Sequence, residues 1–131
     1  AGLGAVSIAA INGPKSLVVS GPKPAVQVLL SKLQLEGRAL TVSHAFHSPL
    51  MAPAAEKLKV IVEGLRVGPP QIPVVTNVTG KVVTEAELRS GSHWADHLVG
   101  AVRFADGMAS LRELGCEVFV EIGPEPTLIK M

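Results

Sequence analysis

The first third of the chain alternates between extended and helical spacing of its apolar residues. Val6 to Ile11 and Ser16 to Ser20 are two short extended runs on either side of the turn signal Asn12-Gly13-Pro14. Because the link is short, the two runs are predicted to pair as an antiparallel hairpin. From Ala25 to Leu35 the apolar residues repeat at helical spacing, and Gly37 is expected to end this helix.

A third strand, Arg38 to Val42, is predicted to follow the helix. Three strands and one helix make up most of a ferredoxin-like unit, whose opening strand and helix are not found in this sequence. We therefore expect residues 1–43 to form a partial ferredoxin-like small subdomain.

The pattern changes in residues 44–131, which are expected to form a second unit. Here apolar runs of strand length alternate with helical segments, an order that favours a parallel α/β layer. The predicted helices are Leu50 to Leu65, one opened by a capping box at Thr84 to Glu87, Trp94 to Leu98, Phe104 to Leu114 and a start after Pro124; the predicted buried strands are Pro73 to Asn77 and Val118 to Ile122.

Composition narrows the function classes. With 131 residues, 47% hydrophobic and 18% charged, the chain can build a core and is not expected to be disordered. A net charge of +1, no Tyr and one Trp argue against nucleic acid or an acidic membrane as a partner. No run is long and apolar enough to span a membrane. Ala1 to Gly4 lacks a basic region and a Met, which argues against a signal peptide and hints at a longer parent chain.

Cys116 is the only cysteine, so an internal disulfide framework is excluded. Its setting, at the start of an apolar run, favours a small buried hydrophobe over a nucleophile. A single cysteine fits a reducing compartment, and we expect the protein to be cytoplasmic.

Candidate chemistry centres on two histidines, His44 and His47, in a segment between a predicted strand and a predicted helix. A histidine there can act as general base toward a hydroxyl nucleophile. Two alternatives stay open: a histidine that caps the helix at Leu50, and a His-x-x-His metal pair, which lacks a further ligand nearby. His97 reads as an ordinary helical histidine and His93 as a solvated loop residue. No Gly-x-Ser-x-Gly turn supplies a serine for the base.

Five blocks, in order, resemble one known family. It is the acyltransferase domain of modular type I polyketide synthases, in its malonyl-selective form. The blocks are Val6–Pro14 with Val18–Gly21, His44–Met51, Pro73–Gly80, Trp94 and His97 with Val102–Phe104, and Val120–Pro124 with Pro126–Leu128.

The resemblance implies a fold, an activity and roles for four residues. The fold would be the partial small subdomain followed by the C-terminal part of an α/β-hydrolase-like core. The activity would move malonyl from coenzyme A to the phosphopantetheine thiol of an acyl carrier protein through an acyl-serine, with no cofactor. His47 would be the general base and acid, oriented by the backbone carbonyl at the position of His97. Phe46 would read the substrate α-carbon, with simple core packing as its alternative, and His44 would support the loop.

The same resemblance implies which partners the protein has and which catalytic groups this sequence would lack. The nucleophile, the oxyanion hole and the arginine that pairs with malonyl would lie upstream of Ala1, so the chain alone is predicted to be inactive. Its partners would be malonyl-CoA, the carrier protein, the remaining N-terminal half of the acyltransferase and neighbouring synthase domains. Two rival hypotheses remain: a ferredoxin-like module that docks on a carrier protein or partner enzyme, and a small metal-binding protein using His44, His47 and His93.

Overall fold

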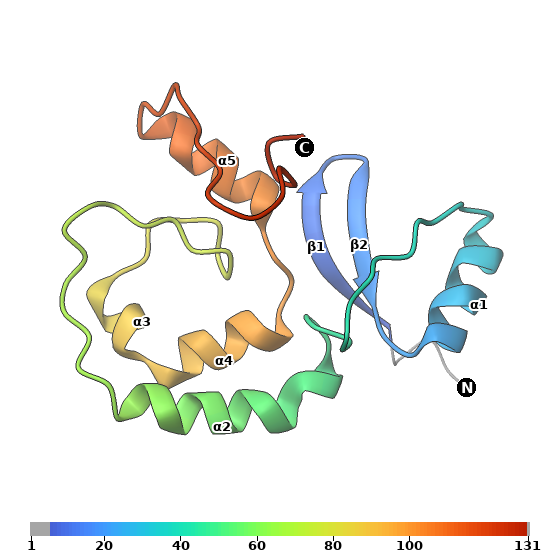
Figure 1. Ribbon diagram of the computed structural model, residues 1–131, viewed down its shortest axis with the longest axis horizontal. Coiled ribbons are helices and arrows are strands. Elements are labelled where there is room, and N and C mark those ends of the chain that lie inside the picture. Colours follow the sequence, from blue (N-terminus) through green and yellow to red (C-terminus); the bar gives the residue numbers. More distant parts are fainter. Residues whose placement is uncertain (1–5, 131) are drawn as a thin grey trace.

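The computed structural model describes residues 6–130, so the expectation about Ala1 to Gly4 lies outside the described residues. Within that range the chain forms an α/β fold with two strands and five α-helices (Figure 1). The elements are β1 (Ser7–Gly13), β2 (Ser16–Ser20), α1 (Lys23–Leu33), the 3₁₀ helix η2 (Pro49–Met51), α2 (Ala52–Glu63), α3 (Glu85–Arg89), α4 (Gly91–Val99) and α5 (Phe104–Glu113). No helix between residues 6 and 130 has the length and apolarity to cross a membrane.

The predicted hairpin is confirmed. β1 and β2 pair antiparallel, with Ser7 opposite Ser20 and Gly13 opposite Ser16. The other edge of β1 meets the segment after α4, because Ala10 forms a parallel bridge with Val102. Helix α5 packs on β1 as well. The hairpin, which opens the described chain, therefore packs against the segment that joins α4 to α5 and against α5 itself.

Helix α1 is confirmed in place but ends earlier than expected. Gln34 takes the left-handed conformation with φ 54°, and the amide of Leu35 donates back to the carbonyl of Leu30 at 3.1 Å. This left-handed cap closes the helix before Gly37 is reached. Asparagine and glycine are the usual residues at such a cap, so the sequence favoured Gly37 over Gln34 as the end of the helix.

The expectation of a third strand is wrong, and so is the three-strand ferredoxin-like unit. Within residues 6–130, residues 38–42 have no strand partner and the sheet consists of β1 and β2 alone. The two predicted strands of a parallel layer are not formed either: residues 118–122 are irregular, and residues 73–77 contribute one isolated antiparallel bridge, Val75 to Val82. A strand needs a partner edge for its backbone groups, and the described residues offer none to these segments.

The helices of the second part follow the apolar periodicity. Helices α2 and α4 lie side by side (Figure 1), and their packing buries Ala55, Val62 and Ala95. At the crossing, a Cβ on Gly91 would lie only 2.5 Å from the carbonyl oxygen of Lys59, so only glycine allows this approach. The capping box of α3 is confirmed, with Thr84 and Glu87 bonded in both directions.

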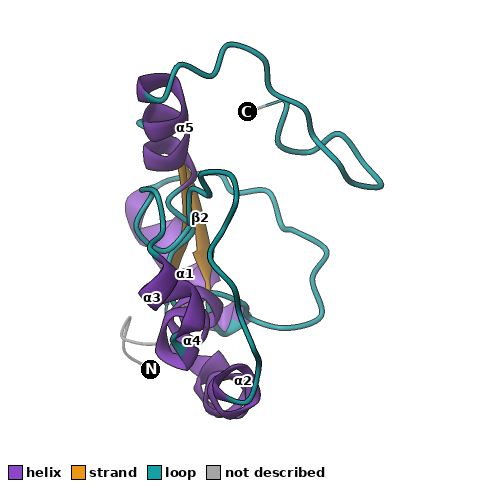
Figure 2. Ribbon diagram, turned by 90° about the vertical axis from the view of Figure 1, so that its left-hand side faces the viewer, coloured by secondary structure: helices purple, strands orange, loops and turns teal. Residues whose placement is uncertain are grey.

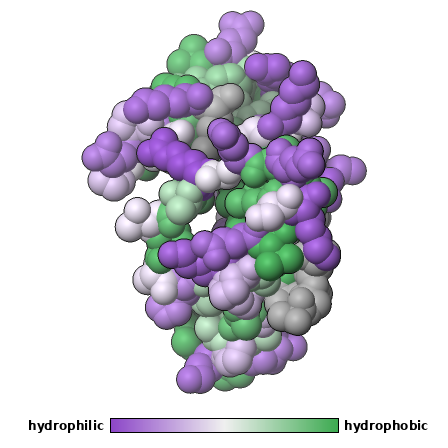
Figure 3. Space-filling model, turned by 90° about the vertical axis from the view of Figure 1, so that its right-hand side faces the viewer, coloured by the Kyte–Doolittle hydropathy of each residue, from purple (hydrophilic) through white to green (hydrophobic). Residues whose placement is uncertain are grey.

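The C-terminal segment after α5 is exposed and irregular, and Figure 2 shows it as a long loop. Val118 is 82% exposed and Ile122 is 96% exposed. The helical start expected after Pro124 is not formed. Cys116, expected to be buried, is exposed, because the apolar run that it opens packs against no described strand. Figure 3, which shows the face on the right-hand side of Figure 1, has apolar patches among polar surface.

Candidate functional site

The segment that carries His47 is a tight turn organised by Ser48. The Ser48 side chain is fully buried; its Oγ donates to the carbonyl of Ala45 at 2.6 Å and accepts from the amide of Leu50 at 3.3 Å. Ser48 thereby caps the 3₁₀ helix η2, whose first residue is Pro49. His47 itself has φ 57°, an uncommon conformation for a residue other than glycine. Such backbone positions cluster at functional sites.

Two bonds tie His47 to the end of α4, far away in sequence. Its amide donates to the carbonyl of Leu98 at 3.1 Å, and its Nδ1 lies 2.9 Å from the carbonyl oxygen of Gly100. A carbonyl oxygen only accepts, so Nδ1 carries the proton and, in the neutral ring, Nε2 keeps its lone pair. The arrangement therefore presents Nε2 as a base, with a backbone carbonyl in place of a carboxylate as the partner of Nδ1.

The carbonyl that orients His47 is not the one that was expected. It belongs to Gly100, whereas the resemblance pointed to His97. The helix α4 ends at Val99, and Gly100 follows it as the cap, with its amide bonded to Asp96 at 2.7 Å. The carbonyls of the last helical turn and of the cap that follows it have no partner within the helix, so the Leu98 carbonyl can accept from the His47 amide and the Gly100 carbonyl from Nδ1.

His97 meets His47 through its ring instead. The centroids of the His47 and His97 rings are 6.2 Å apart in an edge-to-face arrangement. The ring of Trp94 also lies edge to face against that of His97, with 6.4 Å between their centroids. Burial lowers the pKa of His97 below its ordinary value, and the imidazoles of His47 and His93 lower it further. A lowered pKa keeps this imidazole neutral beside the base.

His44 and Phe46 form a separate contact on the exposed side of the loop. Their rings lie 5.8 Å apart, edge to face, and His44 Nδ1 shares a hydrogen bond with Ser43 Oγ at 3.0 Å. Phe46 is 39% exposed, so its ring is free to meet a molecule that approaches the loop. Of the four expected site residues, the structure brings His47 together with His97, and His44 together with Phe46.

His93 was expected in a solvated loop, and this expectation is wrong. It lies in the first turn of α4, is 9% exposed, and shares a hydrogen bond with the hydroxyl of Thr76 at 3.1 Å. The polar run Ser90-Gly91-Ser92 looked like a loop because α4 begins without a side-chain cap. Residues 6–130 contain no group of three or more His, Cys, Asp or Glu placed to hold a metal ion. The hypothesis of a metal site at His44, His47 and His93 has no support in this geometry.

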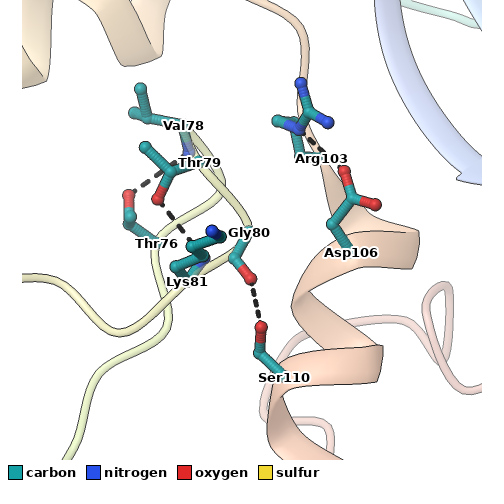
Figure 4. Close-up of polar contacts among 8 residues, drawn as sticks. All are labelled: Thr76, Val78, Thr79, Gly80, Lys81, Arg103, Asp106 and Ser110. Carbon is teal, nitrogen blue, oxygen red and sulfur yellow. Dashed lines mark hydrogen bonds and ion pairs between the residues drawn. The ribbon is translucent and has the colours of Figure 1, made fainter.

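The turn around Gly80 lies close to the start of α5 (Figure 4). The Gly80 carbonyl accepts from Ser110 at 2.6 Å, and the Arg103 amide donates to the Asn77 carbonyl at 2.9 Å. Gly80 has φ 70°, and a Cβ there would collide with the Cβ of Asp106. The loop is thus pressed against the start of α5, which fixes the segment that leads away from Gly100.

Sequence reasoning missed two residues of the site, Ser48 and Gly100. Ser48 carried a usable signal, since a serine followed by proline is a common helix start. Gly100 carried a weaker one, as a glycine after the last helical residue. Its contact with His47 spans 53 positions and has no local signature.

A model of the acyl transferase domain family matches residues 2–131. The chain belongs to the acyl transferase domain family. The spectinabilin polyketide synthase system protein NorB of Streptomyces orinoci is 42% identical over 131 residues, which cover 98% of this chain and 6% of that protein. The chain is therefore similar to one small part of a modular polyketide synthase.

Solved acyltransferases have the same fold. The acyltransferase domain from the second module of the salinomycin polyketide synthase is 42% identical, with a TM-score of 0.87 over 97% of this chain. A malonyl-transacylase solved in complex with its type II polyketide synthase acyl-carrier protein is 35% identical, with a TM-score of 0.84 over 95% of this chain. The chain spans 30% of the first and 41% of the second, so it is a partial domain.

Proposed function

We propose that this chain contributes the catalytic base to an acyltransferase that moves malonyl from coenzyme A to the phosphopantetheine thiol of an acyl carrier protein. The chain would supply His47 and the loop that reads the substrate. The serine nucleophile would come from the rest of the domain, because no Gly-x-Ser-x-Gly turn occurs in the 131 residues.

One observation carries this proposal: His47 Nδ1 lies 2.9 Å from the carbonyl oxygen of Gly100. An imidazole held in this way has its tautomer fixed and its Nε2 directed away from the supporting backbone. A histidine that only capped a helix would have no need of a partner 53 positions away. The left-handed φ of His47 adds to the argument, because the fold maintains it at an energetic cost.

The chemistry follows from the free Nε2. In the first half-reaction Nε2 takes the serine proton while the serine oxygen attacks the thioester carbonyl, and the proton then passes to the departing thiolate of coenzyme A. In the second half-reaction Nε2 takes the proton of the phosphopantetheine thiol, which attacks the acyl-serine. The proton returns to the serine oxygen as it leaves. The Gly100 carbonyl stabilises the imidazolium in both halves without adding a charge.

The partners and the division of the chain follow from the same proposal. Malonyl-CoA and the acyl carrier protein would be the substrates, and the solved complex of a relative with its carrier protein supports the second. The remainder of the acyltransferase and neighbouring synthase domains would be the structural partners. Residues 1–43 would belong to the small subdomain and residues 44–131 to the core. The family match over nearly the whole chain argues against the rival, a free-standing binding module.

The proposal is tested in the complete acyltransferase domain with two matched histidine variants. His47→Ala should lower malonyl transfer to the carrier protein by a factor of about 10²–10⁴, the usual contribution of a general base. His44→Ala is the control, since the interactions that the structure describes for the His44 ring are with Ser43 and Phe46. Equal losses in the two variants would remove the proposed role of His47.

A second experiment tests whether Phe46 reads the α-carbon. Phe46→Ser should open space for an α-methyl group and raise the preference for methylmalonyl-CoA over malonyl-CoA by about tenfold or more, because a methyl-sized contact contributes about 1–3 kcal/mol. A competition assay measures the ratio. An unchanged ratio would leave Phe46 as a packing residue.

The isolated chain provides a third experiment. Incubated with labelled malonyl-CoA, it should gain no covalent label, because the base has no nucleophile to activate. Label on any serine of this chain would refute the assignment of the nucleophile to another part of the domain.

A further inference from the structure

His47 is held by one ring hydrogen bond, and one bond leaves a ring free to swing. The bond from Nδ1 to the Gly100 carbonyl fixes a single ring atom. The ring can still rotate about that point unless something limits its flank, because the second side-chain torsion of histidine is broad. A catalytic base needs its Nε2 held to within about half an ångström of its working position. A second contact is therefore required.

The second contact is supplied by the ring of His97. It meets the ring of His47 edge to face at 6.2 Å between centroids, within the range of favourable aromatic pairs. Since His97 lies in the last turn of α4, it is carried on the same rigid element that ends at Gly100. One helix end thus contacts the base twice, once through a carbonyl and once through a ring.

His97 is in turn held by Trp94, one helical turn earlier. Their rings are 6.4 Å apart, edge to face, and the indole Nε1 donates to the carbonyl of Leu88 at 2.9 Å. The hydrogen bond fixes the indole, the indole limits His97, and His97 limits His47. The three rings form a continuous chain that ends at the base.

The charge state of His97 matters because a cation there would oppose a proton on His47. The titratable groups that face it are His47, from the turn before η2, and His93, on its own helix. From α2, Lys59 and Glu63 approach α4 at Gly91, at the far end of the helix. Burial and the two imidazoles act in the same direction, lowering the pKa of His97 and favouring its neutral form.

We propose that the side chain of His97, backed by Trp94, is a positioning residue that holds the imidazole of His47 against the Gly100 carbonyl. This inference rests on the proposed function of His47. It differs from the expectation for this position, which concerned the backbone carbonyl of His97 and not its ring.

The test compares three substitutions of His97 in the complete acyltransferase domain. His97→Ala should lower kcat by about 10- to 100-fold with little change in KM, since a misplacement of about 1 Å can cost 100-fold. His97→Phe keeps a flat neutral ring and should restore most of that loss. His97→Lys places a cation beside His47 and should move the acidic limb of the pH profile of kcat/KM to lower pH by about 0.5–2 units.

Two results would overturn the inference: equal rates for the Ala and Phe variants, or an unshifted pH profile for the Lys variant. Thermal unfolding of each variant separates a positioning effect from a loss of fold. His47→Ala, measured in parallel, separates this inference from the proposed function. If His47→Ala is inactive while His97→Ala is normal, only the role of His97 fails; if His47→Ala is active, the proposed function fails.

Discussion

Replacing Gly100 by alanine changes the group that holds His47 without altering His47 itself. Gly100 has φ −80°, which any residue adopts, so its backbone conformation is no obstacle. The obstacle is space, because a Cβ at this position would lie 2.7 Å from the carbonyl oxygen of Asp96. That oxygen belongs to the helix backbone and already accepts from the Gly100 amide at 2.7 Å. The clash can therefore be relieved only by moving the end of the helix.

The size of the movement sets the expected loss. Relieving the contact requires the 2.7 Å separation to reach at least 3.0–3.4 Å, a shift of about 0.3–0.7 Å. The same shift at the Gly100 carbonyl would stretch its 2.9 Å bond to His47 Nδ1 toward the limit of a hydrogen bond. If a misplacement of about 1 Å costs 100-fold and the effect scales logarithmically, malonyl transfer should fall about 4- to 25-fold.

Gly64→Ala is the matched control. Gly64 also caps a helix and has φ −85°, but its nearest neighbour, the carbonyl oxygen of Ile61, would lie 3.4 Å from the new Cβ. This is an ordinary contact, so the variant should keep full activity. Transfer of labelled malonyl by the complete domain measures both variants. Equal activities would refute the reasoning that the Gly100 carbonyl orients the base.

Three further predictions concern stability. Gly91→Ala should destabilise the fold by about 1–3 kcal/mol, measured by thermal unfolding, because its Cβ would meet the backbone of Lys59 where α2 and α4 cross. Ser48→Ala should cost about 0.5–2 kcal/mol, since the cap and a buried hydrogen bond are lost together; Ser48→Thr is the comparison that keeps the hydroxyl. The carboxylate of Glu121 accepts from the amides of residues 127–129, and these hydrogen bonds lower its pKa. Residues 127–129 should therefore be fully ordered above the usual pKa of glutamate and should lose that order as the pH falls through the lowered pKa. Hydrogen exchange of those amides, expressed as protection relative to the intrinsic rate at each pH, measures the loss, and Glu121→Gln should weaken their protection at neutral pH. Protection that does not change with pH in the native chain would contradict the assignment.

Local signals in the sequence predicted local structure well. The turn at Asn12-Gly13-Pro14 gave the hairpin, and the spacing of Thr84 and Glu87 gave a capping box that the structure contains. Both depend on residues within a few positions of one another. The same is true of the helices α2 and α5, whose apolar periodicity is set within a single segment.

The strand predictions were wrong for the opposite reason, because a strand depends on residues far away in the sequence. Arg38 to Val42 and Val118 to Ile122 have apolar residues suited to a sheet, but a strand is completed only by a partner elsewhere in the chain. Ile122 is apolar and yet exposed, which shows that an apolar side chain is buried only where another segment packs against it. The prediction that His93 lies in a loop was wrong because its helix begins without a recognisable cap, so no local signal marked where the helix starts.

The site was half predictable. His47 could be found from the residues around it and from a family resemblance. Its partner Gly100 could not, because a contact across 53 positions depends on how α4 packs against the turn at Ser48. The role of His97 was assigned to its backbone in advance, whereas its ring is the part that meets His47.

The central claim is that the fold holds His47 with its proton on Nδ1 and its Nε2 free to act as a base. Nitrogen NMR of the labelled chain, at a pH where the imidazole is neutral, tests this directly by distinguishing the two ring nitrogens. The hydrogen bond to the Gly100 carbonyl predicts a protonated Nδ1 and an unprotonated Nε2. A proton found on Nε2 would mean that the carbonyl does not orient the ring, and would contradict the account.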